Sequence, residues 1–187
     1  MAMAMAMARV VRWTDWDGKG LEHLAVADDG TRITARSLVI GEREGCRFGL
    51  SYTLILDLIW RVREVRAEMV DGARLDLQSD GLGQWRDGHG ADLARLAGCI
   101  DVDIAATPFT NTLPIRRLDL DIGESRTIKV AYVSLPNLAV DAVEQRYSRL
   151  TENRYLYEGL STGFVAELEV DSCGIVGDYP GVFRMAP

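Results

Sequence analysis

The first candidate for chemistry is a serine between two glycines, in the run Gly159-Leu160-Ser161-Thr162-Gly163. This run matches the G-x-S-x-G nucleophile elbow, which follows a strand, opens a helix and needs a histidine base later in the chain. Here the residues after the serine alternate as a strand, and both histidines, His23 and His89, precede it. The pattern therefore predicts a hairpin turn rather than a nucleophile.

A second candidate is the carboxylate pair Asp101 and Asp103, which share one face of a predicted strand. Their Cα atoms would lie about 6.5 Å apart, a spacing that invites comparison with the acid pairs of glycosidases. Neighbours on one strand point the same way, however, and cannot easily flank a sugar from two sides. Because Asp119 and Asp121 repeat the pattern, we interpret both pairs as a solvated strand face. Asp101 or Asp103 is still the candidate general base if the protein is an enzyme.

Metal and phosphate binding have no matching pattern in this chain. His23 and His89 stand apart, whereas a catalytic zinc ion needs three converging protein ligands. Cys46, Cys99 and Cys173 are odd in number and widely spaced, so neither a disulfide framework nor a zinc site is indicated. We expect the three thiols to be reduced and the location to be cytoplasmic. No glycine loop completes a phosphate-binding fingerprint, and no cofactor or metal is predicted.

The segment 107–118 concentrates hydroxyls, an amide and two arginines around two prolines. Proline fixes φ and removes a backbone donor, so we expect most of this segment to be a shaped loop. Such a loop can present polar groups to a ligand. The alternative is that its hydroxyls satisfy their own backbone while Arg116 and Arg117 pair with acids such as Asp101 or Asp119.

Strict alternation of apolar and polar residues recurs at 48–56, 73–78 and 164–170. This period is typical of a strand with one buried face. Asp-Gly pairs between such segments mark the turns of successive antiparallel strands. The expected architecture is a meandering, mostly β protein.

Three segments are less regular. Between Trp60 and Met69 the apolar phase slips by one residue, which a β-bulge would correct, although a helix also fits 54–69. We favour the strand. Short helices are expected at 91–97 and between Asn137 and Leu150, where a strand is the alternative.

Composition indicates one globular domain. The 187 residues are 48% hydrophobic and 26% charged, and 28 acids outnumber 21 bases to give a net charge of -7. A phosphate backbone would repel such a surface, so we expect no nucleic-acid partner. The Met-Ala run of residues 1–8 is too short for a signal-peptide core. We predict a disordered tail over 1–8, one domain over 9–187, and no membrane-spanning segment.

One long motif links the chain to a known family. Residues 99–103 and 107–118 resemble the signature of the "Putative glycolipid-binding" family, bacterial proteins formerly described as a domain of unknown function. Tyr52, Trp60 and the pair Gln145 and Tyr147 fit the same family, and the resemblance covers about residues 12–184. It implies a spiral β-roll, a long curled antiparallel sheet with one or two short helices, similar in outline to periplasmic lipoprotein carriers.

The favoured hypothesis is a non-enzymatic protein that holds an amphipathic small molecule, such as a glycolipid, on the concave face of the rolled sheet. One alternative is an enzyme that acts on a small polar substrate with Asp101 or Asp103 as general base. Another is a homodimeric interaction module whose open sheet edge pairs with itself. The residues expected to contact a ligand are Thr107, Thr110, Asn111, Arg116, Arg117, Asp101, Asp103 and Trp60.

Overall fold

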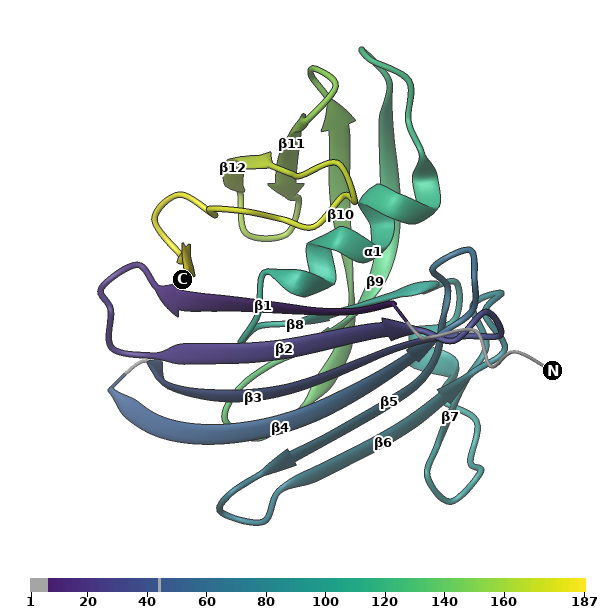
Figure 1. The fold of residues 1–187 in the computed structure, drawn as a ribbon. Helices are drawn as coiled ribbons and strands as arrows, with labels where there is room; N and C mark the ends of the chain where they lie inside the picture. The colour runs from purple at the N-terminus through teal and green to yellow at the C-terminus, as the bar shows by residue number, and fades with distance from the viewer. Residues whose placement is uncertain (1–6, 44) are drawn as a thin grey trace, which may run out of the picture.

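The structure, a computed structural model, describes residues 7–43 and 45–187. Two β-sheets with α1 between them form the molecule (Figure 1). The strands are β1 (Met7–Asp15), β2 (Leu21–Asp28), β3 (Ile33–Arg43), β4 (Cys46–Leu56), β5 (Val62–Met69), β6 (Arg74–Ser79), β7 (Trp85–Asp87), β8 (Asp101–Ile104), β9 (Ser125–Val133), β10 (Val140–Arg149), β11 (Arg154–Gly159), β12 (Phe164–Glu169) and β13 (Phe183–Ala186); the helices are η1 (Ala94–Leu96) and α1 (Phe109–Leu118).

The larger sheet has eight strands in the order β13-β1-β2-β3-β4-β5-β6-β7, and every neighbouring pair is antiparallel. Figure 1 shows it strongly curled, with α1 and the smaller sheet on its concave side. The alternation that predicted strands at 48–56, 73–78 and 164–170 places apolar residues on the buried face, as in β4, where Leu50, Leu54 and Leu56 are buried. The mostly β fold and the long curled antiparallel sheet are confirmed.

The predicted β-bulge is present in β5. Leu56 pairs with Val62 while Ile55 pairs with Glu64, so Arg63 is the extra residue. Because of this insertion, Val62 and Val65 both face the core. The strand prediction for this segment is confirmed, and the helical alternative for 54–69 is wrong.

The smaller sheet has five strands in the order β12-β11-β10-β9-β8. Its edge strand β8 runs parallel to β9, and the connection between them contains α1, as a parallel pair requires. The helix expected between Asn137 and Leu150 is wrong, because most of that segment is β10, where pairing with both β9 and β11 supplies its backbone hydrogen bonds. The helix expected at 91–97 is a single 3₁₀ turn, η1.

Helix α1 corrects the prediction of a loop over 107–118. Pro108 takes the N-cap position, where a missing N–H does no harm, but Pro114 lies inside the helix. An interior proline costs about 3 kcal/mol. Phe109 and Leu113 lose all exposed surface between the two sheets, and burying two such side chains contributes about 3 to 6 kcal/mol. Tertiary packing therefore outweighs the local preference of the sequence.

One hydrophobic core joins the two sheets. Leu24 and Leu54 of the large sheet belong to the same buried cluster as Phe109 of α1 and Val133 of β9. The concave face of the large sheet is consequently filled along most of its length. In the described residues, no helix is both long and apolar enough to cross a bilayer.

The predicted tail of residues 1–8 falls partly outside the described residues. Positions 1–6 lie outside them, whereas β1 already begins at Met7, which pairs with Asp28. The tail prediction therefore does not hold for Met7 and Ala8, and for residues 1–6 it stays a prediction. The division of the remaining chain into one domain stays a prediction.

Candidate binding site

A cavity of about 370 Å³ lies against one face of the smaller sheet. We call it the tyrosine cavity, because tyrosines from three separate segments, Tyr132, Tyr157 and Tyr179, line it. Its lining residues are Arg43, Asp103, Ile104, Ala105, Thr107, Asn111, Tyr132, Val143, Glu144, Gln145, Tyr157, Gly159, Ser161, Thr162, Phe164, Tyr179, Val182 and Phe183.

Strand register explains why the cavity forms here. Gln145 on β10 and Phe164 on β12 are both paired with Gly159 of β11, so the three residues lie in one row across the sheet. Gly159 has no side chain, and the Thr162 hydroxyl lies 2.9 Å and the Tyr157 hydroxyl 3.5 Å from where its Cβ would be. The turn from Gly159 to Gly163 closes this end of the cavity with Ser161 and Thr162, and it is the hairpin turn that the sequence predicted.

The aromatic part of the cavity is a connected group of rings. Tyr157 lies 6.2 Å from Phe164 and 6.1 Å from Tyr179, measured between ring centroids. Tyr179 in turn lies 6.2 Å from Phe183. Burial raises the pKa of Tyr157 and of Tyr179, so both rings keep neutral hydroxyls near pH 7.

Asp103 is the less exposed of the two acids, Asp103 and Glu144, that line the cavity. The Nε2 of Gln145 donates to its Oδ2 at 2.6 Å, and the Thr110 hydroxyl donates to its Oδ1 at 3.1 Å. Burial raises the pKa of Asp103, and these two hydrogen bonds oppose the shift. The prediction of a solvated strand face is wrong for Asp103, because α1 and β10 cover that side of β8. The carboxylate is placed to accept a hydrogen bond from a ligand or to exchange a proton with it.

Asp101 serves a different purpose although it lies on the same strand. It has no exposed surface, and it accepts hydrogen bonds from Arg117 Nη2 at 2.6 Å and Nε at 3.0 Å. Burial raises the pKa of Asp101, while Arg117 lowers it. The solvated-face prediction is therefore wrong here too. A substrate in the cavity cannot reach this carboxylate, so Asp103 is the one acid of the pair that could act as a general base.

A hydrogen-bond network ties the cavity to α1. The Tyr147 hydroxyl donates to Asn111 Oδ1 at 2.8 Å and lies 3.3 Å from Gln145 Oε1. Gln145 in turn donates to Asp103. Burial strongly raises the pKa of Tyr147, which keeps this hydroxyl protonated. The network fixes the orientation of both amides at the cavity wall.

The structure separates the predicted ligand contacts into three groups. Asp103, Thr107 and Asn111 line the tyrosine cavity, and Thr110 contacts it only through Asp103. Asp101 and Arg117 form the buried ion pair.

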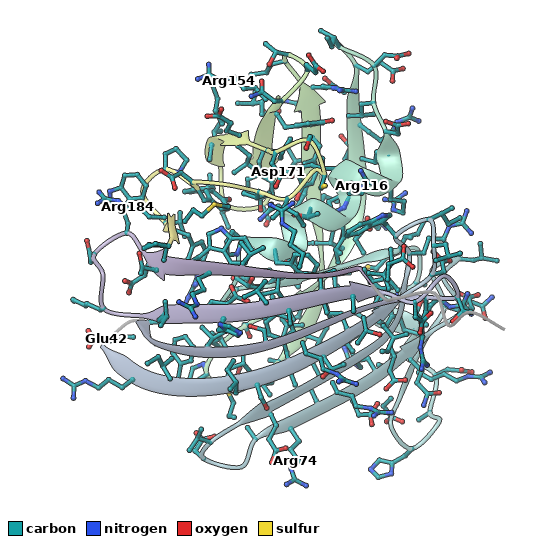
Figure 2. The ribbon with its side chains drawn as sticks, viewed as in Figure 1. Glu42, Arg74, Arg116, Arg154, Asp171 and Arg184 are labelled. Carbon is teal, nitrogen blue, oxygen red and sulfur yellow. The ribbon has the colours of Figure 1, made fainter. Side chains whose placement is uncertain are left out.

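The third group is Arg116 with Trp60. The Arg116 guanidinium stacks over the Trp60 ring at 5.1 Å from its centroid. Its aliphatic part lies against Gly174, where an added Cβ would meet Arg116 Cδ at 2.6 Å. Figure 2 shows Arg116 on α1, close to the segment after β12. Neither Arg116 nor Trp60 is among the described residues that line the tyrosine cavity.

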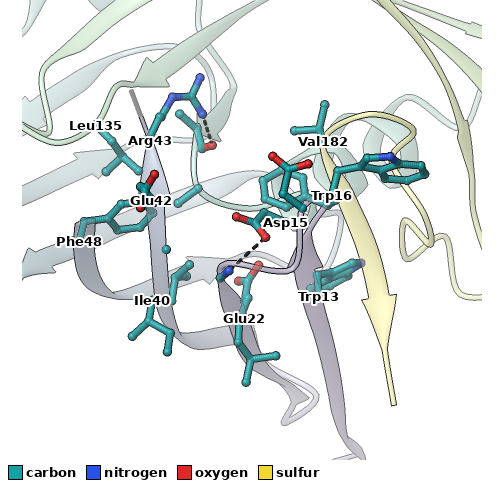
Figure 3. A pocket seen from close by; sticks show the side chains of 18 of the residues that line it. Trp13, Asp15, Trp16, Glu22, Ile40, Glu42, Arg43, Phe48, Leu135 and Val182 are labelled. Atoms are coloured by element: carbon teal, nitrogen blue, oxygen red, sulfur yellow. Dashed lines mark hydrogen bonds between the residues drawn. The ribbon is translucent and has the colours of Figure 1, made fainter. Parts of the chain in front are cut away.

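A second pocket of about 220 Å³ adjoins the first at the open end of the large sheet (Figure 3). We call it the mouth pocket. It shares Arg43, Ala105, Val182 and Phe183 with the tyrosine cavity. Its other lining residues are Trp13, Asp15, Trp16, Asp17, Gly20, Leu21, Glu22, Val39, Ile40, Gly41, Glu42, Phe48, Ala106, Leu135 and Gly181.

Glu22 is the buried acid of the mouth pocket. Its Oε1 accepts hydrogen bonds from Tyr52 at 2.6 Å and from Ser37 at 2.7 Å. No donor among residues 7–43 and 45–187 reaches its Oε2. Burial raises the pKa of Glu22, and the hydroxyls of Tyr52, Thr107 and Ser37 oppose the shift. The sequence did carry a signal for Glu22, since it has the same alternation parity as the buried Leu24 and Val26.

Other lining residues of the tyrosine cavity were not predicted as ligand contacts. Tyr157, Phe164 and Tyr179 lie some forty or more residues after the motif at 99–118. Of these three, only Phe164 lies in a segment whose alternation predicted a strand, and that pattern gave no indication of a cavity. Gln145, by contrast, was one of the residues on which the family resemblance rested.

Known proteins share both the sequence pattern and the fold of this chain. The family described as "Putative glycolipid-binding" matches residues 10–185. The chain belongs to this family. A crystal structure of a DUF1089 family protein from Pseudomonas aeruginosa is 41% identical, covers 89% of this chain and 91% of that chain, and superposes with a TM-score of 0.81. No curated protein matches the sequence.

Family membership confirms the resemblance stated from residues 99–118 and supports a binding role for the chain. The shared fold with the DUF1089 protein extends over nearly the whole of both chains. Bacterial origin, a cytoplasmic location and a homodimer stay predictions.

Proposed function

We propose that this member of the family binds an amphipathic small molecule whose head group is rich in hydroxyls, as in a glycolipid. The observation that carries the proposal is the mixed lining of the tyrosine cavity, in which two acids, one arginine and two amides accompany a group of aromatic rings. Planar acceptors and donors bind sugar hydroxyls, and aromatic faces pack against the C–H face of a sugar ring. This combination favours a carbohydrate-like head over a purely apolar ligand.

The size of the cavity limits what it holds. At about 370 Å³ it lies near the lower end of the range of roughly 300 to 1,000 Å³ for small-molecule sites. That volume accommodates one sugar ring with the first carbons of a tail. The tail would leave past Phe164, which is 42% exposed on the edge strand β12.

The location differs from the hypothesis drawn from the sequence. The concave face of the large sheet is covered by α1 and β8 over most of its length. The proposed head-group site is therefore on the smaller sheet, beside the open end of the large one.

A titration with octyl glucoside below its micellar concentration tests the proposal. Phe164→Ala removes a cavity ring from a half-exposed position, and we expect the dissociation constant to rise by about tenfold from lost packing. Val165→Ala is the matched control, since Val165 is the next residue of β12 and is 55% exposed. Its affinity should stay within about twofold of the wild type. Equal losses in the two variants, or no saturable binding by the wild type, would contradict the proposal.

The natural ligand can be sought without a chosen probe. Native mass spectrometry of the protein purified from its own host should show an added mass that is lost in Asp103→Ala. Asp121→Ala, a change at an exposed acid outside the cavity, should retain that mass. If every preparation shows only the mass of the protein itself, the protein does not hold a ligand stably enough to co-purify with it.

A second candidate is an enzyme that uses Asp103 as general base on a small polar substrate. It is favoured by one observation, the raised pKa of a carboxyl group that lines a cavity. A panel of nitrophenyl glycosides and esters would test it. Turnover by the wild type that disappears in Asp103→Asn would support catalysis, whereas turnover by neither protein would favour binding alone.

A further inference from the structure

We propose that the mouth pocket is a second site, separate from the tyrosine cavity, and that it binds a small primary ammonium ion through Glu22. This second site does not depend on the proposed function, because Glu22 lies outside the described lining of the tyrosine cavity. Three features support it: the direction of Glu22, its unpaired oxygen and the charge around the pocket.

Strand register directs Glu22 into the pocket. On one side Glu22 pairs with Trp13 of β1, and on the other with Val39 of β3. Directly paired residues in a sheet point to the same face. All three are buried, and all three line the mouth pocket. Figure 3 shows Glu22, Asp15 and Trp13 around this hollow.

The unpaired oxygen defines the missing partner. Tyr52 and Ser37 both donate to Oε1, and within the described residues Oε2 has no donor although Glu22 is only 2% exposed. A buried polar atom without a hydrogen bond is destabilising, because it has lost its hydrogen bonds to water and has gained none in the protein. A ligand N–H that enters from the pocket supplies the missing bond, and a positive charge on that nitrogen makes the bond stronger.

The surrounding charge favours a cation over an anion. Asp15, Asp17 and Glu42 line the same pocket, with Arg43 as the single basic residue among the described lining groups. Arg43 already donates to the carbonyl of Ala105 at 2.9 Å. Outside the lining set, Lys19 and Arg47 pair with Glu42 at 3.6 and 3.7 Å, which offsets the charge of that acid. Among the described lining groups, the four acids Asp15, Asp17, Glu22 and Glu42 still outnumber the one base, Arg43.

The cation that fits is organic. Among the described residues, no group of three or more His, Cys, Asp or Glu side chains converges closely enough to hold a metal ion. Trp13 and Phe48 instead supply apolar walls. The pocket volume of about 220 Å³ equals roughly seven water molecules at about 30 Å³ each. A short alkylammonium ion meets both limits, and its N–H groups distinguish it from a quaternary ammonium.

The test is a titration of the full chain with n-butylammonium chloride at pH 8, followed by backbone amide NMR. For five heavy atoms we expect a dissociation constant on the order of 1 mM, with the largest shifts near Gly20, Val39 and Ala106. The neutral analogue 1-butanol should bind at least about tenfold more weakly. Glu22→Gln keeps an acceptor for Tyr52 and Ser37 but removes the charge, so it should weaken butylammonium binding by about tenfold or more.

Two control variants distinguish binding at Glu22 from a general charge effect and from binding in the tyrosine cavity. Asp28→Asn removes one negative charge at the other end of the same strand and should leave the affinity within about twofold. Phe164→Ala, which should weaken octyl glucoside binding, should leave butylammonium binding unchanged, so the two proposals can fail separately. Equal binding of butylammonium and 1-butanol, or shifts centred on Tyr132 and Tyr157, would overturn the inference. If Glu22→Gln does not fold, those two wild-type comparisons decide the question.

Discussion

Arg116 and Arg117 are adjacent in the chain and differ in what they hold. The Arg117 side chain is 14% exposed and lies against the fully buried Asp101. Arg116 is more exposed and stacks on Trp60 at the protein surface. Only Arg117 therefore neutralises a buried charge.

Arg117→Ala should be far more destabilising than Arg116→Ala. Removing one partner of a buried pair leaves an uncompensated charge, which costs about 3 to 5 kcal/mol of unfolding free energy. An exposed cation–π contact contributes about 0.5 to 1 kcal/mol. Urea unfolding of both variants measures the difference. A similar small loss in the two variants would show that Asp101 is not braced by Arg117.

Glu22 should make stability depend on pH in a defined window. Its folded pKa is raised above the ordinary value of 4.5 because burial disfavours the carboxylate. The folded state then binds the proton more tightly than the unfolded state, so the wild type loses stability as pH rises from about 4.5 through the folded pKa. Glu22→Gln has no such proton, and its stability relative to the wild type should increase over that window.

The difference in unfolding free energy between Glu22→Gln and the wild type reports on Glu22 alone. Asp101 and Asp103, whose pKa values are also raised, are present in both proteins and cancel. The difference should be flat below about pH 4 and then grow by at most about 1.4 kcal/mol per pH unit. Unfolding experiments from pH 3 to 8, in the absence of amines, give this curve. A difference that stays constant across the range would contradict the raised pKa.

At the scale of the element, the bulge at Arg63 controls which face of β5 is buried. Val62 precedes the extra residue, and Val65, Ala67 and Met69 follow it, yet all four are buried. Deleting Arg63 would leave Val62 opposite Leu56 and Glu64 opposite Ile55, which is a regular register with the same inward set. The bulge is thus an insertion that the hydrophobic pattern accommodates.

Two single-residue deletions in β5 should therefore differ sharply. Deleting Arg63 should cost about 1 to 2 kcal/mol, from the lost twist and its contact with the Ser79 carbonyl. Deleting Arg66 should cost more than about 3 kcal/mol, because it turns Ala67 and Met69 to the solvent face. Thermal unfolding and circular dichroism compare the two. Equal tolerance of both deletions would show that the register of β5 is not fixed by its buried face.

At the scale of the whole molecule, Cys99 reports on the core that joins the sheets. It is fully buried in the cluster that contains residues of both sheets, whereas Cys46 and Cys173 are exposed. Burial raises the pKa of the Cys99 thiol to about 11. Because the thiolate is the reactive form, both access and ionisation protect Cys99 from thiol reagents.

A thiol reagent should consequently label Cys46 and Cys173 quickly and Cys99 only when the core opens. The native protein should react at once with two equivalents of reagent, one for each exposed thiol. The third equivalent should react slowly, and faster as the urea concentration rises. Cys99→Ser identifies the slow phase. Three fast equivalents would contradict the buried position, and fewer than three after unfolding without reductant would contradict the prediction of reduced cysteines.

Features that depend on local period could be predicted before the fold was known. Alternation placed the strands at 48–56, 73–78 and 164–170, and the phase slip after Trp60 located the bulge within β5. No histidine follows Ser161 in the sequence and a strand pattern does, which identified residues 159–163 as a turn. The motif at 99–118 identified the family. Each of these follows from side chains close together in the chain, where the two-residue repeat of a strand leaves its mark directly.

The conformation of α1 and the protonation and access of the acids depend instead on packing between distant segments. Two prolines argued for a loop, and only burial between two sheets makes a helix over 109–118 favourable. Asp101 and Asp103 alternate like surface acids, whereas Glu22 has the parity of the buried residues of its strand. The pKa values of all three rise because segments distant in the chain cover them. The tyrosine cavity likewise needs β8, α1, β11 and the C-terminal segment together. Desolvation depends on what packs against a group, which the local pattern of residues does not contain.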